Sequence, residues 1–122
     1  MVGEDRLDYI KVGEKIISRL KESGAKKIEA LDVSTKTDLC KVLILASVSG
    51  TDTAKAISQD LENLLNNENI MLEHIDGQFN GKWIVLDFKE IIVHLFQDLI
   101  RNKYNIESLW KSRNNSIIKL LK

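Results

Sequence analysis

Two apolar runs separated by a short polar pair constrain this chain more than any other feature. The runs cover residues 83–88 and 91–96, and only a Lys-Glu pair lies between them. A connection of this length is typical of a tight hairpin between antiparallel strands. If Phe88 lies opposite Ile91, one face of the hairpin is entirely apolar and must enter a core. That face carries Ile84, Leu86, Phe88, Ile91, Val93 and Leu95.

The other face of this hairpin mixes aromatic, polar and charged side chains. His94 of the second run would lie diagonal to Asp87 of the first, close enough for the carboxylate to orient the imidazole ring. Lys-Glu is not a pair that type I′ turns favour, so a register shifted by one residue stays open as an alternative. In the unshifted register the mixed face carries Trp83, Val85, Asp87, Ile92, His94 and Phe96.

Two helices are expected before the hairpin. Apolar residues at helical spacing predict the first helix over residues 5–23, and Gly24 is placed to end it. The second helix follows Thr51 or Asp52, either of which could cap its first turn through a side-chain oxygen. The apolar stripe of this second helix is Ala54, Ile57, Leu61, Leu64 and Leu65.

Three further strands are expected, over residues 27–33, 39–47 and 70–75. The strand at 39–47 is almost continuous in apolar residues, which is typical of a strand covered on both faces, so we place it inside the sheet. Strands and helices in this order predict an α/β fold: a single domain over residues 1–122, with a mixed β-sheet flanked by helices. Residues 111–122 are expected to form a C-terminal tail.

Several broad classes of protein are excluded by the sequence itself. The longest uncharged apolar stretch, residues 42–48, is far too short to cross a bilayer. The first five residues lack the apolar region of a secretory signal. A single cysteine, Cys40, allows no internal disulfide, which is typical of a reducing compartment. We therefore expect a cytoplasmic protein that does not bind membranes.

No sequence pattern for catalysis or metal binding stands out. His74 and His94 are the only histidines, and the chain lacks the spaced Cys and His pairs of a zinc site. No expected strand carries the paired carboxylates that hold magnesium. Asp87 and His94 could form a relay with Ser47 or Ser49, but the Gly-x-Ser-x-Gly turn of such enzymes is absent, so a structural pair is favoured. We expect no catalytic residues, no metal and no cofactor.

Charge and aromatic residues point instead to a binding surface. Residues 56–81 hold five carboxylates and no Lys or Arg, whereas residues 101–122 hold six cations and one Glu. Large aromatics and Arg dominate binding energy in protein interfaces, where a few anchors contribute roughly 2 kcal/mol or more each. The expected partner-binding residues are Trp83, His94, Phe96, Arg101, Tyr104 and Trp110, with Asp87 as the orienting residue.

One ordered set of residues resembles a family signature: Trp83, Leu86-Asp87-Phe88, Val93-His94, Phe96, Arg101, Tyr104, Ile106-Glu107 and Leu109-Trp110. With it, the chain is similar to the ribosomal silencing factor family, also called Iojap-like or RsfS. Upstream, residues 31–33, 46–47 and 56–57 match the family less sharply. Two positions depart from it, because the family usually has Asp where Lys41 stands and Gly where Val48 stands.

The resemblance implies a nucleotidyltransferase-like fold without catalytic residues. Members of the family bind the large ribosomal subunit through ribosomal protein uL14 and sterically block its association with the small subunit, which represses translation. By this resemblance the expected partner-binding residues would contact uL14, and the basic tail would reach rRNA at the periphery. The alternatives are a large-subunit assembly factor and a small nucleotidyltransferase-like enzyme. Formation of a homodimer is left open.

Overall fold

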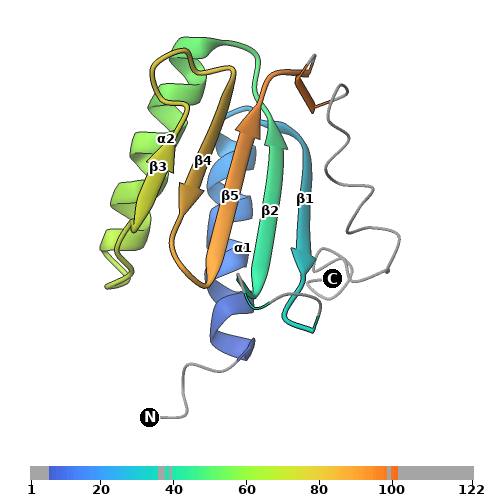
Figure 1. Cartoon of the computed structure of the whole chain (residues 1–122), viewed down its shortest axis with the longest axis vertical. Helices are drawn as coiled ribbons and strands as arrows, with labels where there is room; N and C mark the ends of the chain where they lie inside the picture. Colours follow the sequence, from blue (N-terminus) through green and yellow to red (C-terminus); the bar gives the residue numbers. More distant parts are fainter. Residues whose placement is uncertain (1–5, 36–37, 39, 99, 102–122) are drawn as a thin grey trace.

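Five strands form one mixed sheet, and two helices cover one of its faces, in the part of the chain that the structure describes (Figure 1). The structure is a computed structural model, and it describes residues 6–35, 38, 40–98 and 100–101. Neither of the described helices is long and apolar enough to span a membrane. In chain order the elements are α1 (Arg6–Glu22), β1 (Lys26–Asp32), β2 (Val42–Ser47), α2 (Thr51–Asn66), β3 (His74–Asp76), β4 (Trp83–Asp87) and β5 (Ile91–Phe96).

The sheet has the strand order β1-β2-β5-β4-β3. β2 and β5 run parallel, whereas the other neighbouring pairs are antiparallel, so the predicted mixed sheet is confirmed. β2 lies between β1 and β5 with every residue buried, as its apolar run indicated. The two edge strands are less regular. β1 carries an irregularity between Lys26 and Glu29, and β3 is only three residues long.

The hairpin of β4 and β5 has the register that the sequence predicted. Val85 lies opposite His94, and the N–H of Phe88 donates to the carbonyl of Ile91 at 2.9 Å. Lys89, in the turn, takes a positive φ of 79°, a conformation that lysine rarely adopts. Asp87 stabilises this turn, because its Oδ1 accepts a hydrogen bond from the Lys89 N–H at 2.7 Å. That bond explains how a Lys-Glu turn keeps the predicted register.

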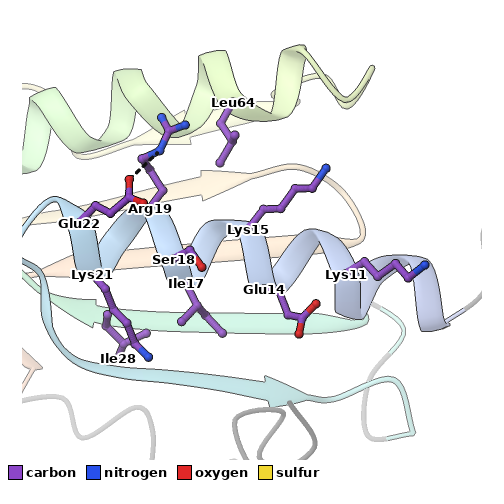
Figure 2. Close-up of a pocket in the computed structure, with 10 residues that line it drawn as sticks. All are labelled: Lys11, Glu14, Lys15, Ile17, Ser18, Arg19, Lys21, Glu22, Ile28 and Leu64. Carbon is purple, nitrogen blue, oxygen red and sulfur yellow. Dashed lines mark ion pairs between the residues drawn. The ribbon is translucent and has the colours of Figure 1, made fainter. Parts of the chain in front are cut away.

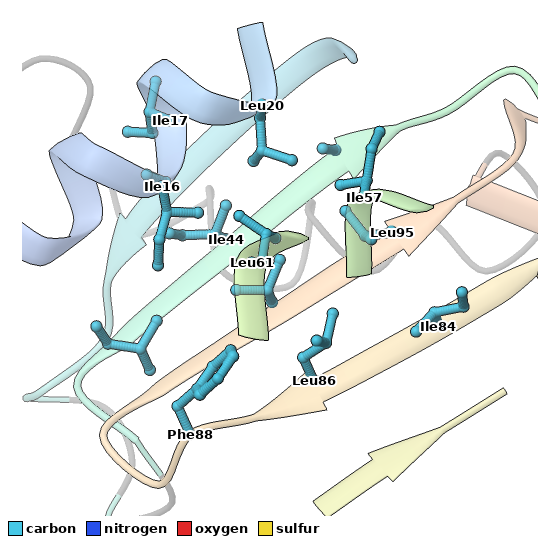
Figure 3. Packing of buried hydrophobic residues seen from close by; sticks show 14 of the residues in the cluster. Ile16, Ile17, Leu20, Ile44, Ile57, Leu61, Ile84, Leu86, Phe88 and Leu95 are labelled. Carbon is cyan, nitrogen blue, oxygen red and sulfur yellow. The ribbon is translucent and has the colours of Figure 1, made fainter. Parts of the chain in front are cut away.

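The main core lies between the two helices and the apolar face of the hairpin. Ile16 of α1 and Leu61 of α2 point toward the sheet in Figure 3, and both are fully buried. Burying a side chain of this size stabilises the fold by roughly 1.5–3 kcal/mol relative to leaving it exposed. The six hairpin residues predicted for the core are each at most 3% exposed: Ile84, Leu86, Phe88, Ile91, Val93 and Leu95.

Three boundaries differ from the expectations. Gly50 is the N-cap of α2, in place of Thr51 or the residue after it, and no side chain caps the helix. Thr51 instead donates its hydroxyl to the carbonyl of Asn80 at 3.0 Å, so this side chain is engaged by a distant loop. β2 begins at Val42, later than predicted, and β3 is confined to His74–Asp76.

Candidate functional site

The mixed face of the hairpin points away from the main core. Both helices pack against the opposite face of the sheet, and Figure 1 shows them behind it. Phe96 is fully buried, whereas the other five residues of the mixed face keep part of their surface in solvent. Those partly exposed residues are Trp83, Val85, Asp87, Ile92 and His94.

Trp83, His94 and Phe96 form an aromatic cluster at the end of the sheet where β4 begins. The centroids of their rings are 5.6, 5.8 and 6.0 Å apart, and the ring planes are tilted against one another. Such separations are those of favourable aromatic pairs. Phe96 is the buried member, and the other two remain partly exposed. The cluster therefore has one ring fixed in the protein interior and two rings that remain accessible to a partner.

Trp83 determines which form of His94 is present. The indole Nε1–H of Trp83 donates to Nδ1 of His94 at 3.0 Å. Because an indole nitrogen can only donate, Nδ1 must be unprotonated and Nε2 must carry the proton. Burial lowers the pKa of His94 from 6.5 to about 4, since the charged ring would lose hydration. At neutral pH the site therefore presents an uncharged imidazole.

We expect the folded protein to protonate His94 only near a pKa of about 4. Between the ordinary pKa of 6.5 and that lowered value, the unfolded chain binds the proton first, so the free energy of unfolding decreases as the pH falls. Above this window the ring is neutral in both states and no loss occurs. NMR titration of the imidazole C–H resonances measures the pKa of His94. A wild-type value near 6.5 would show that burial does not lower this pKa. Trp83→Phe removes the donor to the neutral ring and should raise the pKa.

Asp87 is not hydrogen-bonded to His94 among the described residues, which corrects its expected orienting role. Val85 lies directly opposite His94, and Asp87 stands at the turn end of β4. There its carboxylate accepts the hydrogen bond from Lys89, because the turn needs an acceptor for that N–H. Trp83 orients the ring instead, because its Nε1–H donates a hydrogen bond to Nδ1 of His94.

Phe96 and Arg101 are buried, which corrects their expected role as partner contacts. They are 0% and 4% exposed. The Nη1 of Arg101 donates to the hydroxyl of Ser47 at 2.9 Å, and its guanidinium lies 5.6 Å from the centroid of the Phe96 ring. Both residues therefore secure the end of β5 from inside. The Ser47 hydroxyl accepts this bond, and neither Ser47 nor Ser49 is hydrogen-bonded to His94 among the described residues, so the alternative of a relay has no geometric support there. The remaining expectations, for Tyr104, Trp110 and the tail at 111–122, fall outside the described residues.

One exposed aromatic residue was missing from the predicted set. Phe79, in the loop between β3 and β4, is 90% exposed. Its signal in the sequence is a pair of flanking glycines, Gly77 and Gly81, which indicate a turn of unusual backbone conformation. The predicted set is confined to the hairpin and the residues after it, and so it excludes this loop.

A depression beside α1 is lined mainly by charged side chains of the helix. Figure 2 shows its lining side chains on two sides of the helix, with Lys15 toward α2 and Lys21 on the other side. Arg19, also in the lining, forms an ion pair with Asp60 at 2.7 Å, as expected for a solvated helix surface. No group of His, Cys, Asp and Glu residues within the described ranges could hold a metal ion.

Comparisons with known proteins converge on one family. Residues 8–121 match the family described as "Ribosomal silencing factor during starvation". The ribosomal silencing factor RsfS of Chromobacterium violaceum is 26% identical over 110 residues, which cover 90% of each chain. A crystal structure of a protein from Chromobacterium violaceum is similar with a TM-score of 0.78 and 26% identity, over 82% of this chain and 83% of the other. The mitochondrial Iojap-related protein of Arabidopsis thaliana is 35% identical over 48 residues, 39% of this chain and 26% of its own length.

Proposed function

The chain belongs to the ribosomal silencing factor family, and from this membership we propose that it binds the large ribosomal subunit through ribosomal protein uL14. Bound there, it occupies the space that the small subunit needs, and so it represses translation in the cytoplasm. The observation that carries the proposal is the aromatic cluster. Two of its rings, those of Trp83 and His94, are partly exposed on the sheet face that both described helices leave uncovered.

The cluster is suited to burial against a protein because the indole N–H is already paired and the imidazole ring is neutral. The Nε2–H of His94 is the donor for which the partner must supply an acceptor. The N–H of Trp83 is satisfied by His94, so covering the indole leaves no unpaired donor. His94 is uncharged at neutral pH, and a neutral ring costs less to desolvate than a charged one. Phe96 and Arg101 secure the strand end from inside, which limits the entropy that binding would remove.

Exclusion of the small subunit requires no chemical step. One bound molecule blocks one large subunit, so inhibition should be stoichiometric and independent of added nucleotide. Asp60 and Glu68 form ion pairs with Arg19 and Lys15 of α1. The exposed carboxylates of Glu73 and Asp76, at β3, would therefore be the ones that face a basic ribosomal surface. Such charge complementarity mainly accelerates association, and salt weakens it.

Co-sedimentation with isolated ribosomal subunits tests the proposal. The protein should sediment with the large subunit and not with the small one, and its addition should keep mixed subunits apart. Raising the salt concentration should weaken the binding, because the complementary charges are screened. Binding that leaves subunit joining intact would favour an assembly role, and tight binding of nucleotide with magnesium would favour an enzyme.

A further inference from the structure

Phe79 is held out into solvent by the loop of residues 77–82 that joins β3 to β4. The side chain is 90% exposed, more than Met71 at 64%, the other large hydrophobic residue that stands out from the described surface. A ring with so little buried area adds almost nothing to the stability of the fold. Single exposed apolar residues are common on protein surfaces. The distinguishing feature of Phe79 is the fixed shape of the loop that carries it.

Two glycines hold this loop in one conformation. Gly77 has a φ of +83°, and a Cβ there would lie 1.8 Å from the carbonyl oxygen of Trp83. Gly81 has a φ of +70°, and a Cβ there would lie 2.7 Å from Cγ2 of Thr51. The N–H of Gly81 donates to the carbonyl of Gly77 at 3.0 Å, which closes the loop on itself. Only glycine satisfies both close approaches at positive φ.

Side chains from two other segments tie the loop down. The hydroxyl of Thr51, at the start of α2, donates to the carbonyl of Asn80 at 3.0 Å. The Oδ1 of Asn80 accepts the N–H of Lys82 at 2.9 Å. Gln97, which follows β5, donates its Nε2–H to the carbonyl of Gly81 at 3.4 Å. Phe79 is thus carried by a loop whose backbone is held by hydrogen bonds, so burial of the ring requires little further ordering of the backbone.

The loop lies at the same end of the sheet as the aromatic cluster. Figure 1 shows the connection from β3 to β4 at the end where β4 begins, and Gly77 packs against the backbone of Trp83. We propose that Phe79 is a second apolar anchor beside Trp83, which inserts into an apolar depression on the protein partner. This inference rests on the proposed function and extends its contact surface from the hairpin to the β3–β4 loop.

The charges around the loop favour a protein partner over RNA. Phe79 lies within residues 56–81, which contain no Lys or Arg. Glu73 and Asp76, just before the loop, are both exposed, and Lys82, the last residue of the loop, adds one exposed cation. Carboxylates in this position repel a phosphate backbone. They attract the basic side chains of a protein surface instead. The expected binding pocket is therefore apolar and bordered by Lys or Arg.

Phe79→Ala is the test, with isolated uL14 and intact large subunits as separate probes. The substitution should weaken binding to both by about tenfold or more, because an apolar anchor is lost. It should leave the urea midpoint of unfolding unchanged, since the ring is 90% exposed. Phe79→Leu, which keeps an apolar side chain, should retain part of the affinity. Met71→Ala is the matched control, because it truncates an exposed apolar residue outside this loop.

Each outcome separates the inference from the function on which it rests. Unchanged binding of Phe79→Ala, while the wild-type protein binds both probes, overturns the inference alone. Failure of the wild-type protein to bind isolated uL14 overturns the proposed function as well. A loss seen with intact subunits but not with isolated uL14 would place the ring on RNA or on another ribosomal protein, which overturns the assignment of Phe79 to the surface of uL14.

Discussion

Trp83→Ala is expected to weaken binding to the large ribosomal subunit by about 30-fold or more, the effect of removing an anchor worth ~2 kcal/mol. The substitution removes the largest ring of the aromatic cluster. It also leaves Nδ1 of His94 without its donor, so a partner that covers the cluster would bury an unsatisfied acceptor. A titration of the labelled protein with large subunits at fixed ionic strength measures the change.

Loss of binding must be distinguished from loss of folding, because Trp83 is partly buried. Trp83→Phe keeps an aromatic ring and removes the N–H, so it should weaken binding less than Trp83→Ala. Leu64→Ala truncates another partly buried residue, which packs on the main core from α2, and it should leave binding unchanged. A folded Trp83→Ala variant that binds as tightly as the wild type would show that the aromatic cluster is not part of the interface.

Leu95→Ala is expected to lower the free energy of unfolding by about 2–5 kcal/mol, the range for truncating a large residue in a closed core. Leu95 is 0% exposed on β5, with Ile84 of β4 opposite it and Ala46 of β2 on the other side. The cavity cannot collapse easily, because both neighbouring strands are hydrogen-bonded to β5. This loss is a large share of the ~5–15 kcal/mol by which typical domains are stable.

Urea denaturation followed by circular dichroism measures this loss of stability. Met71→Ala removes an apolar side chain of similar volume that is 64% exposed, and it should change the free energy of unfolding by no more than about 0.5 kcal/mol. A loss below about 1 kcal/mol for Leu95→Ala would contradict a tightly packed core.

The hairpin was the part of the fold that the sequence predicted best. Alternation along a strand assigns each residue to a face, so the apolar residues of β4 and β5 could be placed in the core without a structure. The same rule placed Trp83, His94 and Phe96 together on the other face. Alternation does not say how deeply a face is covered, and Phe96 lies in a second buried cluster with Leu45. The expected contact role of Phe96 was wrong for that reason.

Side-chain partners were harder to predict than faces. Asp87 was expected to orient His94, and the two residues do lie on the same face of the hairpin. The Asp87 carboxylate instead accepts a hydrogen bond from the N–H of Lys89 in the turn. Arg101 was expected to contact a partner because Arg contributes strongly to protein interfaces, whereas the Ser47 hydroxyl and the Phe96 ring hold it inside. These outcomes depend on contacts between segments distant in the chain. A single sequence does not specify such contacts.

The helix cap shows the same limit. Thr51 has the residue type of an N-cap, but it is the first residue of α2, so the cap falls at Gly50, and the Thr51 hydroxyl donates to the carbonyl of Asn80. That contact crosses from the helix to the β3–β4 loop, and it became visible only with the fold. The two glycines of the loop were apparent in the sequence. The close approach of the Trp83 backbone, which requires glycine at position 77, was not.

Neither edge of the sheet is suited to growth by addition of another molecule. A long, flat and unprotected edge strand would accept a strand from a neighbouring copy. β3 offers only His74–Asp76, with polar and exposed ends, and β1 is interrupted between Lys26 and Glu29, where Lys27 has a φ of 51°. High concentrations of the folded protein are therefore not expected to seed fibrils through the edges of the described sheet.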